Sequence, residues 1–423
     1  MLFLSKTLVV ATAGGDDDAS AEFTGDTTSA WLSVVLQLIN GAGSIEQSSV
    51  SPATWGSLID AGTNVLHLGL AVAAEGGSNP PQNFAEGAFE ALGAITTGSL
   101  TSSSAFEHSS DTVVMQAQKA SSTDFIGEVH LSNTDAQFGL PDSSFLPSSA
   151  NCVMMQAVVF DSAASPFSYS SSSSMISSSV SSLSFLDCEN GSEITVSDLE
   201  VPIEIKLPVD LEETLPVKGS LPPSLSDVYN VTVPGNSTTH LIFKPTRVDG
   251  NASFEGATNA HFVVLLAYNR SADETDFDAR LEVPFSLIDT LESGAFLIPP
   301  AGTSLREFYL YVYKTALITF RSPDIQAVAG IYSVKVINSH PELTVDYEYS
   351  RFSSLCMWFN RTSQQYQHDG CFSSPKSTPR LVSCLCNHLT SFGSDSVVKP
   401  NYVDLIGGAS LFKNLAGNPL YLA

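Results

Sequence analysis

The stretch CLCNHLT, residues 384–390, places two cysteines, a histidine and a threonine close together. Three kinds of chemistry use these residue types: metal ligation, disulfide bonding and attack on a peptide bond. A zinc site could recruit His388, but the cysteines of this region lack the C-x2-C spacing typical of zinc ligands. We therefore expect disulfides here, with no metal and no cofactor.

The chain has six cysteines, an even number that permits complete pairing without proving it. Residues two apart on a strand point to the same side, so Cys384 and Cys386 can each reach a separate partner across a sheet. A bond between two such close neighbours would be strained. Four cysteines allow three connectivities, and spacing alone does not choose among them. The cysteines of this cluster are Cys356, Cys371, Cys384 and Cys386.

The other two cysteines, Cys152 and Cys188, bracket a serine-rich tract at 168–184. The low complexity of the tract predicts a loop, a candidate for O-glycosylation, that leads into a strand at 183–186. We expect a disulfide between Cys152 and Cys188 that closes this loop. Two buried free thiols are the alternative.

His388, Leu389 and Thr390 have the functional groups needed to break one peptide bond. The threonine hydroxyl can attack the preceding carbonyl through a five-membered ring, but an ordinary peptide bond is planar and the hydroxyl is a poor nucleophile. A neighbouring imidazole, with an ordinary pKa of about 6.5, can take the hydroxyl proton, and a tight turn can hold the groups together. The product is an ester, formed by an N-to-O acyl shift, which water then splits. Without such a turn, the three residues predict only a solvated histidine in a hairpin.

The charge balance excludes one broad class of partner. The chain has 18 Lys and Arg against 44 Asp and Glu, and its net charge of −26 repels nucleic-acid backbones. The acidity, the cysteines and the sequons together favour an oxidising compartment outside the cytoplasm. The sequence contains neither G-x-S-x-G nor H-E-x-x-H, so a secreted hydrolase is not expected. The glycosylation candidates are Asn190, Asn230, Asn236, Asn251, Asn269 and Asn360.

The N-terminal part of the chain predicts helices. We interpret residues 1–25 as a leader, a disordered segment or the start of a fragment, because their apolar run is a marginal signal peptide. Apolar residues then recur at helical spacing at 31–38, 55–70 and 84–95, which predicts a small helical subdomain over 26–105. The second helix opens with Ser51-Pro52, an N-cap followed by proline at the first helical position.

From residue 106 the apolar pattern changes to period two, which predicts a large antiparallel β-sandwich over 106–395. The expected fold class is therefore α+β, with a small N-terminal helical subdomain followed by this sandwich and its disulfide-bonded end. The predicted strands are VVMQAQK, CVMMQAVVF, PIEIKL, HLIFKP, HFVVLLAY, REFYLYVYKTALITF, IYSVKVIN and LTVDYEY.

An ordered set of landmarks closes the sandwich: Cys356, Trp358, Gly370, Cys371, Cys384, Cys386, His388, Leu389, Thr390 and Phe392. This set resembles the GPCR proteolysis site, or GPS motif, which ends the GAIN domain of adhesion receptors and polycystins. The motif spans 352–395, and the order of helices, sandwich and motif agrees with it. The resemblance implies disulfides Cys356–Cys384 and Cys371–Cys386. It also implies cleavage between Leu389 and Thr390, with His388 as the base and Thr390 as the nucleophile.

The chain departs from the motif at one position and points to one branch of the family. Many members carry a second tryptophan shortly before the second cysteine, where this chain has Tyr366 or His368. After the threonine, adhesion receptors continue with a strongly apolar agonist segment, whereas this chain reads TSFGSDSVVKPNYVDL. That stretch is more similar to polycystin-1-like proteins. Residues 396–423 would then form a linker toward a first membrane helix that this chain does not include.

The resemblance implies a juxtamembrane ectodomain of a polycystin-1-like receptor or channel protein, on the extracellular side of the cell membrane. It would cut itself once and keep both pieces associated, which is not turnover catalysis because the substrate is its own backbone. Its partner would be its own C-terminal fragment, with an extracellular ligand or a channel subunit as a further candidate. Two alternatives stay open: a non-cleaving adhesion or scaffold module of the same fold, and the GAIN domain of an adhesion G-protein-coupled receptor.

Overall fold

The computed structural model describes the chain between Ser51 and Val397, with gaps. The described residues are 51, 53–60, 63, 93, 96–97, 99–100, 105–121, 124–125, 127–141, 146, 152–161, 165, 167, 176–189, 191–209, 216–249, 261–285, 294–306, 308, 318–322 and 325–397. The leader expected at 1–25, the helix expected at 31–38 and nearly all of the linker expected at 396–423 lie outside this set.

The described part of the chain contains 21 strands in three sheets. Every paired strand is antiparallel to its neighbour, so the predicted antiparallel β fold is confirmed. The long sheet runs β1 (Ala105–Ser109), β2 (Val113–Ala120), β5 (Val153–Phe160), β6 (Val180–Asp187), β21 (Ser391–Val397), β17 (Thr344–Asn360), β11 (Thr238–Asp249) and β14 (Gly294–Ile298), with β7 (Glu193–Ile194), β9 (Val217–Leu221) and β18 (Gln365–Gln367) attached. The β20 sheet runs β19 (Cys371–Ser373), β20 (Leu381–Cys386), β8 (Ile203–Pro208), β4 (Gln137–Leu140) and β3 (Gly127–His130). The β16 sheet runs β10 (Ser226–Val233), β16 (Gly330–Asn338), β12 (His261–Tyr268), β13 (Ala279–Pro284) and β15 (Ile318–Phe320).

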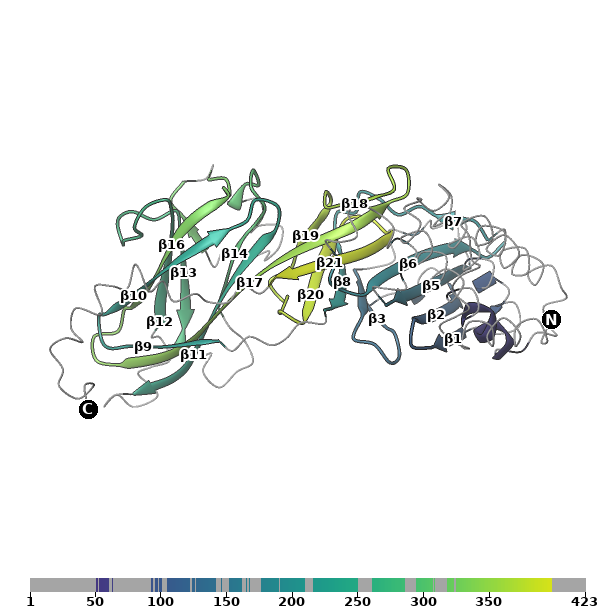
Figure 1. Ribbon diagram of the computed structural model, residues 1–423, viewed down its shortest axis with the longest axis horizontal. Helices are drawn as coiled ribbons and strands as arrows, with labels where there is room; N and C mark the ends of the chain where they lie inside the picture. Colours follow the sequence, from purple (N-terminus) through teal and green to yellow (C-terminus); the bar gives the residue numbers. More distant parts are fainter. Residues whose placement is uncertain are drawn as a thin grey trace, which may run out of the picture.

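Strand β17 passes through two packed units, as Figure 1 shows. In the site unit, the C-terminal half of β17 lies with β21, β6, β5 and β2, and these strands share a core with the β20 sheet. In the distal unit, the N-terminal half of β17 lies with β9, β11 and β14, and these strands share a second core with the β16 sheet. The strands therefore form two units where the sequence predicted one sandwich. Period-two alternation cannot reveal this, because a strand of 17 residues serves both cores without interruption.

Strand β5 shows how both faces of the site unit are filled. All eight of its residues are buried. Met155 and Val159 face the core shared with the β20 sheet, whereas Met154 and Val158 belong to a cluster on the opposite face. Burying a side chain of this size contributes about 1.5–3 kcal/mol, so a strand covered on both faces is a strong anchor. The continuous apolar run of the sequence reflects this double burial.

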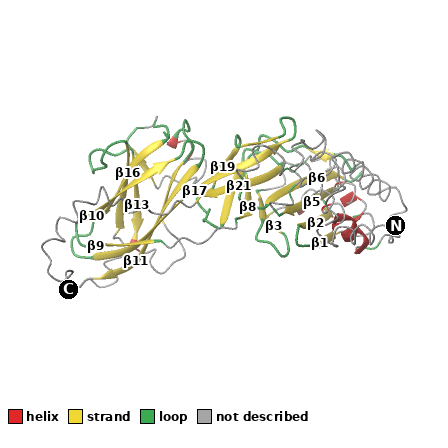
Figure 2. Ribbon diagram, viewed as in Figure 1, coloured by secondary structure: helices red, strands yellow, loops and turns green. Residues whose placement is uncertain are grey.

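A short helix covers the outer face of the long sheet beside β1 and β2 (Figure 2). Residues 53–60 are helical, and the backbone N–H of Thr54 donates to Oγ of Ser51 at 3.2 Å, which is the predicted N-cap. Trp55 and Ile59 are buried in the same cluster as Met115 of β2. The rest of the helical subdomain predicted over 26–105 lies mostly outside the described residues and stays a prediction.

Two strand predictions need correction. The sequence predicts one strand over 306–320, but Leu305, Arg306 and Phe308 are helical, and the strand β15 that the structure describes covers Ile318–Phe320. Leu305 and Phe308 are both buried, and apolar residues three apart fit a helical turn as well as a strand. The strand expected at 183–186 begins earlier, at Val180, because serines of the tract join the ladder with β21. The end of the serine tract is therefore strand and not loop.

Candidate functional site

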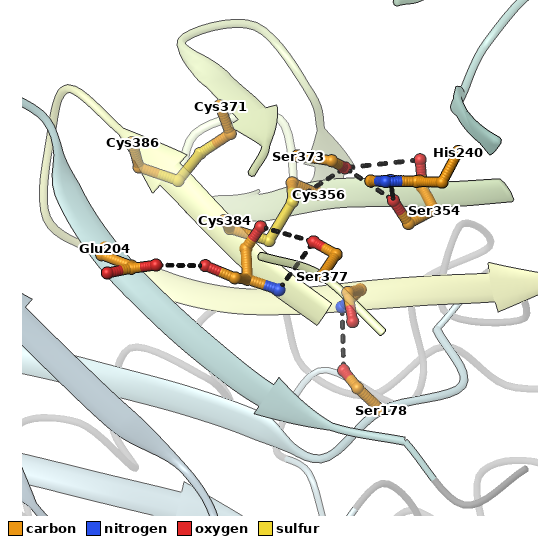
Figure 3. The surroundings of a disulfide bond; sticks show 12 residues. Ser178, Glu204, His240, Ser354, Cys356, Cys371, Ser373, Ser377, Cys384 and Cys386 are labelled. Atoms are coloured by element: carbon orange, nitrogen blue, oxygen red, sulfur yellow. Dashed lines mark hydrogen bonds between the residues drawn. A yellow bond between two sulfur atoms is a disulfide. The ribbon is translucent and has the colours of Figure 1, made fainter. Parts of the chain in front are cut away.

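Two disulfides fix the strands around residues 387–390 (Figure 3). Cys356 of β17 is bonded to Cys384 of β20, which ties the long sheet to the β20 sheet. Cys371 of β19 is bonded to Cys386, which lies directly opposite it on β20. These are the pairings that the resemblance to the GPS motif implies.

The third disulfide joins Cys152 to Cys188 across the serine tract, the pairing expected from sequence over two free thiols. All six cysteines of the chain are therefore in disulfides, and no thiolate is left to ligate a metal. Within the described ranges, no cluster of three or more His, Cys, Asp or Glu residues is arranged to hold a metal ion.

A buried chain of hydrogen bonds connects the distal unit to the first disulfide (Figure 3). Nε2 of His240 on β11 lies 2.7 Å from Oγ of Ser354 on β17, and that hydroxyl donates to Oγ of Ser373 at 2.8 Å. Ser373 Oγ is 3.4 Å from Sγ of Cys356. His240 also stacks on Phe352, with ring centroids 4.3 Å apart, and complete burial lowers its pKa to about 3. The ring is thus neutral at physiological pH, and it donates to Ser354 as a fixed link between the units.

The link between β20 and β21 is tied down by backbone hydrogen bonds. The N–H of Asn387 donates to the carbonyl of Gly370 at 3.1 Å, and its own carbonyl accepts from the N–H of Leu199 at 2.9 Å. The N–H of Leu389 donates to the carbonyl of Val196 at 3.1 Å. The link is thus held from one side by the turn before β19 and from the other by the segment after β7.

Gly370 allows this close approach. Its φ is +75°, a conformation that side-chain-bearing residues rarely adopt. A Cβ at this position would lie 2.6 Å from Oδ1 of Asn387 and 3.2 Å from Nδ1 of His388. Both the backbone conformation and the available space therefore require glycine.

The His388 ring is half-buried between two aromatic residues of the motif. Its centroid is 4.7 Å from that of Trp358 in an edge-to-face contact and 5.9 Å from that of Phe392. The indole N–H of Trp358 donates to the carbonyl of Asp369 at 2.8 Å, which fixes the indole in place. Trp358 and Phe392 therefore position the imidazole.

Asn387 fixes the tautomer of His388. Oδ1 of Asn387 lies 2.9 Å from Nδ1 of the ring, and because a carbonyl oxygen only accepts, Nδ1 carries the proton. Nε2 then keeps its lone pair, and this atom is buried without a hydrogen-bond partner. Burial lowers the pKa of His388, an effect that Asp369 and Asp198 oppose. The ring is therefore a neutral base with a free lone pair near pH 7.

Thr390 is bonded away from the imidazole. Its Oγ1 donates to the carbonyl of Phe359 at 3.3 Å, and its own carbonyl accepts from Oγ of Ser182 at 3.5 Å. Five described residues other than glycine have positive φ, and all five lie outside the link. The structure brings His388, Leu389 and Thr390 into one half-buried link, but it shows no unusual φ there.

Strand β21, which begins directly after Thr390, lies inside the long sheet. It pairs with β17 from Ser353↔Val397 to Trp358↔Phe392 and with β6 at Ser391 and Phe392. Two serines that precede β6 accept further hydrogen bonds along the same edge of β21. The N–H of Ser394 donates to Oγ of Ser178 at 2.8 Å, and the N–H of Ser396 donates to Oγ of Ser177 at 3.0 Å. Phe392 is 1% exposed and belongs to the core shared with the β20 sheet. Hydrogen bonds on both edges and one buried aromatic side chain therefore hold the segment.

Tyr366 occupies the core where many members of the resembled family have a second tryptophan. It is 7% exposed, and its ring contacts that of Phe359 edge to face at 5.4 Å. His368, the other candidate, is exposed. Because the carbonyl of Phe359 accepts the Thr390 hydroxyl, Tyr366 supports the strand to which that hydroxyl is bonded.

Comparison with known proteins agrees with this geometry. Residues 267–393 match the GPS family, described as GAIN subdomain B. Polycystin-1-like protein 3 from Mus musculus is 37% identical to the chain over 65 residues, which are 15% of this chain and 3% of that protein. This chain carries a polycystin-1-like GAIN domain. Polycystin-1 from Homo sapiens is 26% identical over 87 residues, 21% of this chain and 2% of its own length.

This chain matches a small share of these relatives, since the matched stretches amount to 2–4% of their lengths. The match to the GPS family begins within β12 and ends within β21, so it includes strands of both packed units. Among the residues of the chain that the structure describes, no helix has the length and apolar character needed to cross a bilayer.

Several residues of the site were not found from the sequence. Asn387 fixes the imidazole tautomer, Ser182 and Phe359 bind the two oxygens of Thr390, and Ser354 links His240 to the disulfide region. Asn387 gave the one signal available, because it directly precedes the histidine of the motif. The others come from distant strands and carry no pattern of their own.

The sequons of the chain lie in different settings. Asn230, Asn236 and Asn269 are exposed. The half-buried Asn360 donates from Nδ2 to Gln367 at 2.8 Å. The other two, Asn190 and Asn251, lie outside the described residues.

Proposed function

We propose that this GAIN domain cuts its own backbone once, between Leu389 and Thr390, and keeps both pieces in one fold. The observation that carries the proposal is the state of His388. Its Nε2 is buried, unpartnered and free to accept a proton, and it lies two residues from a threonine hydroxyl. Leaving a buried polar atom unsatisfied costs about 1–3 kcal/mol. Nδ1 of the structural His240 is also buried without a partner, so what sets His388 apart is the threonine hydroxyl two residues along the chain.

In this proposal Nε2 of His388 takes the proton from Oγ1 of Thr390, and Oγ1 attacks the carbonyl carbon of Leu389. The C–N bond then breaks, and its nitrogen receives the proton and becomes the new amino group of Thr390. Water hydrolyses the resulting ester, which leaves a carboxylate on Leu389 and restores the hydroxyl. Before the attack, the hydroxyl must rotate away from the carbonyl of Phe359.

The fragment that begins at Thr390 would remain in place as β21. It contains no cysteine, so only non-covalent contacts would hold it after cleavage. Those contacts are the ladders with β17 and β6 and the burial of Phe392. Cleavage would therefore convert a covalent connection into one that force or a ligand can break.

We place this domain on the extracellular side of a polycystin-1-like membrane protein. Three disulfides and exposed sequons support an oxidising compartment. Its partners would be its own C-terminal fragment and, as a further candidate, an extracellular ligand or a channel subunit.

A non-cleaving adhesion or scaffold module is the second candidate function. One observation favours it: the Thr390 hydroxyl is bonded to Phe359, on a link without unusual φ. In that case, the disulfides and sheets would serve only to space and present binding surfaces.

The chain secreted from eukaryotic cells distinguishes the two. Self-cleavage with retention predicts one peak in native size-exclusion chromatography that separates into two bands on a denaturing gel, even without reductant. A single denatured band at the full mass would contradict cleavage. Two separate native peaks would contradict retention of the fragment.

A further inference from the structure

The outward face of the β16 sheet is covered by the chain on one side. On the β12 side, Ala272 and Phe277 of the loop between β12 and β13 pack against Val263 and Leu265. A 3.4 Å hydrogen bond from the N–H of Ala272 to Oγ of Ser333 fixes this loop. This small cluster lies apart from the main core of the distal unit. The loop thus protects the apolar half of the face over β12.

The β10 side of the same face is open to solvent. Val228 of β10 is 56% exposed and Ile331 of β16 is 55% exposed. Among the strands that the structure describes, β10 is also at the edge of its sheet. Val228 lies opposite Lys335 and Ile331 opposite Thr232, so the two apolar side chains stand apart on this face, beside a strand edge that can pair with another chain unless it is screened.

Two sequons flank these apolar side chains. Val228, Asn230 and Thr232 are all exposed and alternate along β10, so they share the outward face. Thr232 lies opposite Ile331 in the ladder, and the N–H of Asn269 donates to the carbonyl of Ile331 at 2.9 Å. Asn230 lies opposite Ser333, two residues along β16 from Ile331, so both asparagines lie beside the same end of that strand.

We propose that N-linked glycans on Asn230 and Asn269 cover this face of the distal unit. In the reaction that attaches them, Nδ2 of the asparagine forms a bond to C1 of the first sugar of a polyprenyl-diphosphate oligosaccharide. The C1–O bond to the diphosphate breaks, the diphosphate leaves with the electron pair, and Nδ2 loses one proton. Both sequons have the required hydroxyl residue, Thr232 and Ser271, and a glycan is bulky and solubilising.

The sugars suit the surface that they would cover. A sugar ring presents C–H groups on one face and the N-acetyl sugar adds a methyl group, which can pack on Val228 and Ile331. Its hydroxyls remain in water. The edge of β10 would be screened at the same time. The two glycans would therefore cover the β10 side of this face, as the loop between β12 and β13 covers the β12 side.

Asn360 provides an internal comparison. Its Nδ2 donates to Oε1 of Gln367 at 2.8 Å, and its Oδ1 accepts from the N–H groups of Thr362 and Ser363 at 2.9 and 3.1 Å. The side chain is half-buried and forms part of a turn, whereas Asn230 and Asn269 are exposed. We expect lower occupancy at Asn360.

Occupancy is measured on the full chain secreted from eukaryotic cells. Glycans are removed enzymatically in heavy-oxygen water, which converts each modified asparagine into labelled aspartate, and the peptides are analysed by mass spectrometry. We expect most molecules to be labelled at Asn230 and Asn269, with fewer at Asn360. A folded chain that is unlabelled at Asn230 and Asn269 would overturn the proposal and leave the face to a protein partner.

The covering role needs a second measurement. Asn230→Gln with Asn269→Gln should self-associate in light scattering, and adding Val228→Thr and Ile331→Thr should return it to the size of the wild type. Asn236→Gln, in the neighbouring turn, is the matched control and should not self-associate. If the double glutamine variant is not secreted, removing the glycans from folded wild type makes the same comparison. A deglycosylated chain that stays as small as the wild type would overturn the covering role.

Discussion

The hydroxyl of Thr390 donates to the carbonyl of Phe359 at 3.3 Å, while Nε2 of His388 stays buried without a partner. Two groups that must exchange a proton for cleavage are therefore close in sequence but not bonded to each other. Threonine is stiff at χ1, so the hydroxyl has few alternative positions. In the proposed reaction, the hydroxyl must first leave the carbonyl of Phe359.

The pH dependence of cleavage follows from the burial of His388. The reaction needs the neutral ring, and burial lowers the pKa of His388 below its ordinary 6.5. Cleavage should therefore keep more than half of its full rate at pH 6.5, and the pH at which the rate halves should lie below 6.5. The rate of appearance of the fragment, followed in chain made in a slowly cleaving variant such as Thr390→Ser, measures this. A rate that halves at or above pH 6.5 would contradict the assigned base.

Gly370→Ala should disturb the link more than an ordinary glycine substitution. The new Cβ would meet Asn387 Oδ1 at 2.6 Å, in addition to the strain of φ +75°. Gly302→Ala is the matched control, because its φ is +87° but nothing lies within 4 Å of the added Cβ. In both variants, backbone strain should lower the free energy of unfolding by about 1–3 kcal/mol. Only Gly370→Ala should also slow cleavage, and equal cleavage in the two variants would show that the contact with Asn387 does not matter.

His240 should make the fold sensitive to acid. Its pKa is about 3 in the folded chain and about 6.5 when unfolded, so below pH 6.5 the unfolded chain binds the additional proton. The neutral His240 ring therefore makes its full contribution to the free energy of unfolding above pH 6.5. That contribution falls by about 1.4 kcal/mol per pH unit as the pH falls toward 3. His240→Gln lacks this term while keeping a donor for Ser354. Denaturant unfolding should show that the free energies of unfolding of the wild type and His240→Gln converge between pH 7 and pH 4. A difference between these free energies that stays constant with pH would contradict a buried neutral ring.

Phe392→Ala should loosen the fragment after cleavage. The side chain is 1% exposed, and truncating a buried phenylalanine costs about 3–5 kcal/mol. Because the fragment has no disulfide, this loss should appear as dissociation of the fragment in native chromatography. Phe138→Ala is the control, since Phe138 is buried in the same core but lies on β4. Equal release of the fragment from both variants would indicate general destabilisation.

The sequence predicted the parts of the fold that have local or repetitive signals. The strands β2, β5, β8, β12 and β16 lie close to their expected positions because each has a run of apolar residues bounded by turns. Cys356–Cys384 and Cys371–Cys386 are the pairings that the resemblance implies, and Cys152–Cys188 is the pairing expected for the two cysteines that bracket the serine tract. The division into two units was missed, since β17 has one continuous pattern across both.

The site was predictable to the level of residue type. His388, Trp358 and Phe392 do meet, as an ordered motif requires. The direction of the Thr390 hydroxyl could not be predicted, because its acceptor is a backbone carbonyl on a strand 31 positions earlier. Backbone atoms have no sequence identity, so pattern analysis cannot find them. For the same reason, the tautomer of His388 required the position of Asn387.

The most direct test of the account is the identity of the fragment's first residue. The wild-type chain is secreted from eukaryotic cells, denatured and analysed by mass spectrometry beside His388→Ala, Thr390→Ser and Thr390→Val, of which valine keeps the shape of threonine without the hydroxyl. We predict a fragment of residues 390–423 in the wild type and in Thr390→Ser, and an intact chain in the other two. A wild-type chain that stays intact, or a fragment that persists in Thr390→Val, would contradict self-cleavage by the threonine hydroxyl.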